Sequence, residues 1–80
     1  MDNDAYGSPV VDLADLDALD ETEMVEGYMD GFTGEPEPMG NRSRSYWHGW
    51  RNGAVDGHHR KLDAAMEILA SKVVARSRAA

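Results

Sequence analysis

Glycines spaced by four residues mark two places in the middle of this 80-residue chain: Gly27 and Gly31, and then Gly49, Gly53 and Gly57. Both series lie in segments with helical periodicity, where each glycine costs roughly 1 kcal/mol relative to alanine. A spacing of four puts each series on one face of its helix, and a face without side chains lets another backbone approach closely. We therefore expect two helices packed through these glycine faces, within one chain or across a homodimer, unless Gly57 simply ends its helix.

The sequence before the first glycine series predicts the start of two helices. Ser8 and Pro9 suit the N-cap and the first position of a helix, and apolar residues recur at every third position over the ten residues that follow. Asp20 and Glu23 have the form of a capping box. They precede a second amphipathic helix, residues 24–32, which contains the first glycine pair.

The rest of the chain predicts a loop and a second helical region. Gly34 and the two prolines in Glu35–Pro38 end the preceding helix, and the loop extends to residue 41. Ser43 suits the N-cap of a periodic segment over 43–77, which forms either one long helix or two helices broken near Gly57. We thus expect an all-α fold: a small α-hairpin with an extra acidic N-terminal helix and a long or broken C-terminal helix.

The expected organisation is one small domain. Residues 1–8 are polar and terminal, so we expect a disordered N-terminus there, followed by a single helical domain over 9–80. That domain divides into three parts, an acidic helical half at 9–33, a Pro/Gly loop at 34–41 and a basic, aromatic helical half at 42–78.

Charge is distributed unevenly along the chain. Residues 1–38 hold twelve acids and no lysine or arginine, whereas residues 39–80 hold eight bases and three acids, and the net charge is −7. Either the acidic half folds onto the basic half, or it is displayed to a basic partner. The chain has no cysteine and no apolar run near the roughly 20 residues of a membrane span, so we expect a cytoplasmic protein without a membrane partner.

Three aromatic residues and three arginines are concentrated within residues 41–52. They are Arg42, Arg44, Tyr46, Trp47, Trp50 and Arg51. Arginines beside aromatic rings form the kind of surface that neutralises phosphate and stacks on unpaired bases. The alternative is that the two tryptophans form the core of a thin domain, with the arginines at its rim.

A longer pattern surrounds this segment. It consists of Gly27-Tyr28-x-x-Gly31-x-x-Gly34, a proline-containing loop, Asn41-Arg42-Ser43, and then Tyr46-x-x-Gly49-Trp50-Arg51. From Gly27 to Ala54 the chain thereby resembles the ribosome modulation factor family, which includes small ciprofloxacin-modifying proteins.

The resemblance implies two helices joined by a loop that bind the small ribosomal subunit, its rRNA and its proteins, near the messenger path. Such proteins help to drive ribosomes into an inactive, paired state. By resemblance the binding surface lies on Arg42, Arg44, Tyr46, Trp50 and Arg51. The family is basic including its N-terminus, so the acidic half of this chain is a departure that opposes docking on rRNA unless it folds away.

These observations predict a non-catalytic modulator that binds and blocks a functional site on a nucleic-acid machine, most simply the ribosome. The alternative is an inhibitor whose carboxylates imitate DNA phosphates and block a basic protein complex, as phage-encoded anti-CRISPR proteins do. Its acidic patch would comprise Asp12, Asp15, Asp17, Asp20, Glu21 and Glu23. No nucleotide-binding, nucleophile or metal-ligand motif is present, so we expect no enzymatic activity, cofactor, metal or small-molecule substrate.

Overall fold

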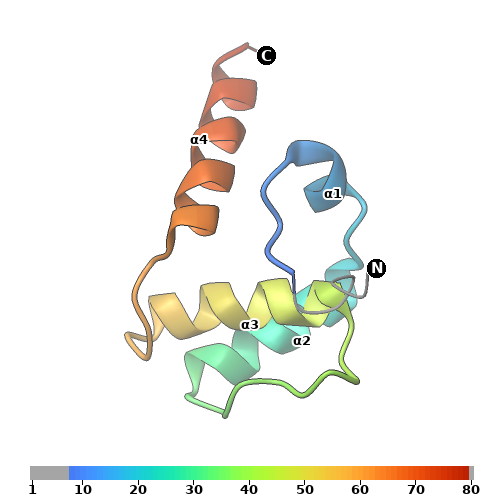
Figure 1. Ribbon diagram of the computed structural model, residues 1–80, viewed down its shortest axis with the longest axis vertical. Helices are drawn as coiled ribbons and strands as arrows, with labels where there is room; N and C mark the ends of the chain where they lie inside the picture. The colour runs from blue at the N-terminus through green and yellow to red at the C-terminus, as the bar shows by residue number, and fades with distance from the viewer. Residues whose placement is uncertain (1–7, 80) are drawn as a thin grey trace.

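The structure, a computed structural model, describes residues 8–79, and within that range it contains four α-helices and no strand (Figure 1). The helices are α1 (Leu13–Asp17), α2 (Glu21–Phe32), α3 (Arg44–Asp56) and α4 (Ala64–Ala79). Helices α2 and α3 lie side by side, and α1 and α4 stand on the same side of α3 (Figure 1). The predicted all-α class is confirmed.

Helices α2 and α3 pack through their glycines within the chain. A Cβ built on Gly53 would lie 2.8 Å from the amide nitrogen of Phe32, and one on Gly31 would lie 2.8 Å from that of Ala54. Cβ atoms at Gly27 and Gly49 would likewise run into the opposite backbone. No side chain separates the two helices along this line, so the backbones themselves form the interface.

The two packed helices run parallel, whereas the helices of an α-hairpin are antiparallel. The carbonyls of Met24, Tyr28 and Phe32 face Gly49, Gly53 and Gly57 in that order, so residue numbers rise together along both helices. The loop from residue 33 to 43 returns along the pair to begin α3 beside the start of α2 (Figure 1). The expected antiparallel hairpin is therefore wrong, and the helices are parallel. A loop of this length can reach either end of α2, so it does not fix the orientation.

Both helix starts lie at one end of this pair, and polar side chains satisfy them. Asp20 accepts a hydrogen bond from the amide of Glu23 at 3.0 Å, and Ser43 accepts one from the amide of Tyr46 at 3.1 Å. Glu23 does not complete the capping box, because its carboxylate accepts a hydrogen bond from the hydroxyl of Ser43. Carboxylates at this end also offset the two positive helix-dipole ends that parallel packing brings together.

The core is small and consists mainly of α3. Tyr46, Trp50 and Ala54 form one buried cluster on the face toward α2 and the loop. The indole N–H of Trp50 donates to the carbonyl of Glu35 at 3.1 Å and so ties the returning loop to the helix. Trp47 is also buried, and Val10 and Leu69 are the buried apolar residues that the N-terminal segment and α4 contribute.

The N-terminal segment departs from the predicted helix at Ser8 and Pro9. Helix α1 begins only at Leu13, with Asp12 as its N-cap. The preceding residues are not helical, because their carbonyls accept tertiary hydrogen bonds and Val10 is drawn into the core. The expected disordered stretch over 1–8 lies outside the described residues except for Ser8, whose carbonyl accepts a hydrogen bond from Arg44.

The segment after α3 is broken at Gly57, and the alternative of two helices is the one present. Gly57 is both the C-cap of α3 and in close contact with the carbonyl of Phe32, and His58 adopts a left-handed φ of 66°. Asp63 then accepts a hydrogen bond from the amide of Met66 at 2.9 Å in the first turn of α4. Over residues 8–79 no helix is long and apolar enough to cross a membrane.

Candidate nucleic-acid interface

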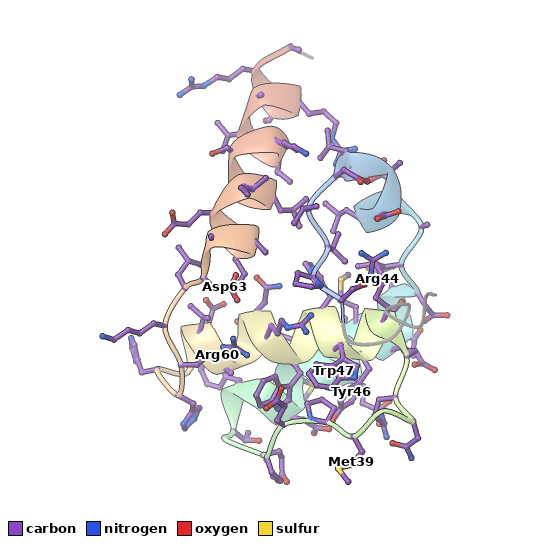
Figure 2. All side chains as sticks on the ribbon, in the orientation of Figure 1. Met39, Arg44, Tyr46, Trp47, Arg60 and Asp63 are labelled. Carbon is purple, nitrogen blue, oxygen red and sulfur yellow. The ribbon has the colours of Figure 1, made fainter. Side chains whose placement is uncertain are left out.

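One face of α3 carries a series of cationic side chains. Arg44, His48 and Arg51 follow at helical spacings of four and three, and Arg60 from the loop after α3 extends the series. We call these four residues the cationic row. Figure 2 shows Arg44 near the N-terminal end of α3 and Arg60 near its C-terminal end.

The members of the cationic row are close enough to perturb one another. Burial lowers the pKa of Arg51, and the charges of Arg60 and Arg44 lower it further, while Asp63 and Glu37 partly oppose them. The pKa of His48 is lowered first by burial and then by Arg51 and Arg44, so His48 is held in its neutral form. The fold thus keeps like charges near one another at a partly buried place, and perturbed groups of this kind cluster at functional sites.

Aromatic rings of α3 hold three guanidinium groups in place. Arg42 lies 3.7 Å from the centre of the Tyr46 ring, and Arg51 lies 4.9 Å from that of Trp47. Arg60 lies 5.8 Å from the centre of the Trp50 ring. Cation–π contacts of this kind fix a guanidinium group while leaving N–H donors at its edge.

The aromatic residues themselves do not form a stacking surface. Tyr46, Trp47 and Trp50 are 7%, 9% and 8% exposed, so their ring faces are covered by protein and cannot receive unpaired bases. The sequence-based assignment of these three residues to direct nucleic-acid contact is therefore wrong for the fold as it stands. They belong to the core and orient the arginines, which is the alternative that the sequence left open.

Tyr46 illustrates this structural role. Its hydroxyl donates to the carboxylate of Asp30 on α2. Burial raises the pKa of Tyr46 to about 12, and the hydrogen bond to Asp30 and the charge of that carboxylate add to the effect. Trp47 differs, because no atom among residues 8–79 accepts a hydrogen bond from its buried indole N–H.

Arg44 is fully engaged in holding the N-terminal segment. Its guanidinium donates to the carbonyls of Ser8 and Pro9 at 3.2 and 2.9 Å, and it pairs with the carboxylate of Asp15 at 3.1 Å. The segment from Ser8 to Asp17, which we call the acidic arm, therefore covers this end of the cationic row. Arg44 cannot bind phosphate while the acidic arm is in place.

The predicted acidic patch is largely used inside the chain. Asp12 and Asp20 are N-caps, Asp15 pairs with Arg44, and Asp17 pairs with Arg76 of α4 at 2.8 Å. Glu23 accepts from Ser43, which leaves only Glu21 without a hydrogen bond or ion pair among the described residues. The first of the two charge hypotheses, an acidic half folded onto the basic half, describes this arrangement.

Two members of the cationic row, His48 and Arg60, were missed by the sequence reasoning. His48 could have been found, because it shares a helical face with Arg44 and Arg51. Arg60 could not, because its position depends on the backbone turn at Gly57 and His58. There it also pairs with Asp63 at 3.4 Å.

Comparisons with protein-family models, with curated proteins and with solved structures give no match for this chain. Across residues 8–79 no three His, Cys, Asp or Glu side chains gather closely enough to hold a metal ion.

Proposed function

We propose that this protein is a non-catalytic modulator that binds an RNA surface on a nucleic-acid machine, most simply the ribosome, through the cationic row. The observation that carries this proposal is the series of Arg44, Arg51 and Arg60 along α3, in which burial and the two outer guanidinium groups lower the pKa of Arg51, in a chain whose net charge is −7. Mutually repelling guanidinium groups gain most from a phosphate backbone, which supplies closely spaced negative charges.

The arrangement suits phosphate contacts better than base reading. The rise of 1.5 Å per residue separates Arg44 and Arg51 by about 10 Å along the helix axis. The contacts of Arg51 with the Trp47 ring and of Arg60 with the Trp50 ring restrict these arginines before binding, which lowers the entropy lost when they meet a ligand. With the aromatic faces covered, binding rests on the charges of Arg51 and Arg60, and on that of Arg44 once the acidic arm releases it, because such charges position a protein on a nucleic-acid backbone.

The family resemblance supports the same proposal. It covers Gly27–Ala54, which is α2, the returning loop and nearly all of α3, and it assigns binding to arginines that lie on or beside the cationic row. The family is basic at its N-terminus, whereas the N-terminal half of this chain is acidic. In the structure the acidic arm is folded onto Arg44 and α4 instead of projecting toward a ligand. The alternative of a DNA-mimic inhibitor is not favoured, since most of its proposed carboxylates already have partners within the chain.

Cosedimentation with purified ribosomes, followed across salt concentrations, tests the proposal. Replacing both Arg51 and Arg60 with alanine should weaken binding and reduce the slope of log affinity against log salt by about one unit for each phosphate that is no longer neutralised. The matched control replaces Lys61 and Arg78, two exposed cations outside the row, with alanine and changes net charge equally. A wild-type chain that does not sediment with ribosomes, or two double variants with equally weakened binding, would contradict the proposal.

A further inference from the structure

Helix α2 turns its small residues inward and its large apolar residues outward. Gly27 and Gly31 face α3, while Val25, Met29 and Phe32 on the opposite face are 49%, 61% and 48% exposed. These three residues follow at spacings of four and three, so they form one continuous strip, which we call the outer strip of α2. An apolar strip of this kind in an amphipathic helix normally faces a core.

The surface around the outer strip is uneven and apolar. A hollow of about 230 Å³ is lined by Tyr28, Met29, Phe32 and Thr33. A second, of about 330 Å³, includes Met24, Val25 and Tyr28. Large side chains beside hollows are suited to interdigitation with another helix.

Charge restricts what can cover the outer strip. Glu21 and Glu26 lie at its edges, and Asp56 lies beside it, where it accepts a hydrogen bond from Tyr28 at 2.6 Å. Helix α2 contains four acids and no base; Glu23 and Asp30 accept hydrogen bonds from Ser43 and Tyr46, and Glu26 pairs with Arg42 at 3.5 Å, so Glu21 is the carboxylate that two copies of α2 placed face to face would bring together. The occupant must therefore combine apolar side chains with positive charge.

Helix α4 of the same chain has these properties. It holds three bases and one acid, and it buries only Leu69 within the chain. Lys72 donates to the carbonyl of Val11 and Arg76 pairs with Asp17, so Arg78 is the base of α4 that can meet a partner's carboxylate. Ile68 and Val74 are each 48% exposed, and Val74 lies between the cavity that α4 shares with α3 and the outer surface of the helix. A shallow hollow of about 430 Å³ on α4 is lined by Ala70, Ser71, Val74, Ala75 and Arg78. It is large enough for the end of a methionine or phenylalanine side chain.

We propose that a second copy of this chain covers the outer strip of α2 with its α4, and that the contact is reciprocal in a symmetric dimer. In such a dimer each chain gives one α4 and receives one, so two identical contacts close the assembly. The helices are antiparallel, because that orientation sets Arg78 in the last turn of α4 beside Glu21 in the first turn of α2. His48 of the cationic row lines the second hollow beside the outer strip, whereas Arg44, Arg51 and Arg60 do not line either hollow.

Sedimentation equilibrium on the full chain, over a wide range of concentrations, tests the dimer with three variants that each add one positive charge. Met29→Lys alters the outer strip, and Ala75→Lys alters the hollow on α4. Met39→Lys is the matched control, because Met39 is 74% exposed in the loop and lies on neither surface. The first two variants should raise the dimer dissociation constant at least tenfold, and the control should leave it unchanged.

Mixing the two weakened variants identifies which surfaces meet. A Met29→Lys chain keeps a native α4 and an Ala75→Lys chain keeps a native outer strip, so a mixed dimer retains one of its two contacts. The mixture should therefore associate more tightly than either variant alone. Far-UV circular dichroism confirms that each variant is folded, and high salt should weaken the wild-type dimer because opposite charges meet.

Three results would overturn the proposal. The first is a wild-type chain that stays monomeric at all concentrations. The second is a dimer that Met29→Lys or Ala75→Lys leaves intact, and the third is a mixture that associates no better than its components, since either means that other surfaces pair.

Discussion

Replacing Gly53 with alanine should destabilise the protein, although alanine is the better helix former. Alanine gains about 1 kcal/mol of helix propensity at an interior glycine. The new Cβ, however, would lie 2.8 Å from the amide nitrogen of Phe32 and would press on the carbonyl of Tyr28. Both contacts are to backbone, so no side chain can rotate away and the helices must separate.

The size of the effect follows from these two opposing contributions. Overpacking costs about 1–3 kcal/mol when side chains can adjust. A rigid backbone on the other side places this site near the upper value, so the net loss of unfolding free energy is about 2 kcal/mol. For a domain of this size, 1 kcal/mol corresponds to about 4–8 °C in Tm, so Tm should fall by roughly 8–16 °C.

Thermal and urea unfolding followed by circular dichroism measure this change. The matched control is Gly40→Ala in the loop, where an added Cβ meets nothing within 4 Å and φ is not positive. It should be neutral or stabilising by up to about 1 kcal/mol, because alanine restricts the unfolded chain. A higher Tm for Gly53→Ala than for the wild type would refute the close backbone contact.

Three further predictions concern other parts of the chain. Because the folded pKa of Tyr46 is about 12, above its ordinary value of about 10, its neutral form stabilises the fold fully below pH 10 and this contribution is lost between pH 10 and 12; urea titrations should show the wild type more stable than Tyr46→Phe below pH 10, with the difference decreasing across that range. The lowered pKa of His48 should make stability fall as pH drops below about 6.5, where the unfolded chain takes up the proton more readily, and His48→Gln should remove that part of the decrease in Tm. Asp15→Asn should loosen the acidic arm and tighten ribosome binding, measured by cosedimentation, whereas Glu67→Gln on α4, with the same charge change, should leave binding much less affected.

The sequence predicts where the helices begin and end better than it predicts how they are oriented relative to one another. The glycine spacing predicts the contact between α2 and α3, and Asp20, Ser43 and Gly57 predict where helices begin and end, because these residues act locally. The parallel orientation is not predictable in this way, since the loop before Ser43 is long enough for either arrangement. The periodicity of apolar residues also predicts the outer strip of α2, but it does not predict that the strip is exposed. The glycine face of the same helix packs against α3 and leaves the strip on the opposite side.

The candidate site follows the same rule. Arginines and aromatic residues in residues 41–52 predict a cationic, aromatic segment, but whether each side chain is buried or exposed depends on tertiary contacts. Tyr46 and Trp50 are buried because the returning loop covers them, and that loop is anchored by a backbone carbonyl at Glu35. Arg44 is occupied because the acidic arm returns from 36 residues away to meet it.

The parallel pairing of α2 and α3 has a consequence for how the chain folds. Met24 meets Gly49, Tyr28 meets Gly53 and Phe32 meets Gly57, so every one of these pairs is separated by 25 residues of sequence. In an antiparallel hairpin, contacts near the turn close a short loop and those farther away follow one after another. Here the first contact closes as long a loop as the last, and once it forms, the others need no additional closure entropy. The two helices should therefore associate in a single cooperative step, and amide hydrogens along their shared face should exchange with nearly equal free energies of opening.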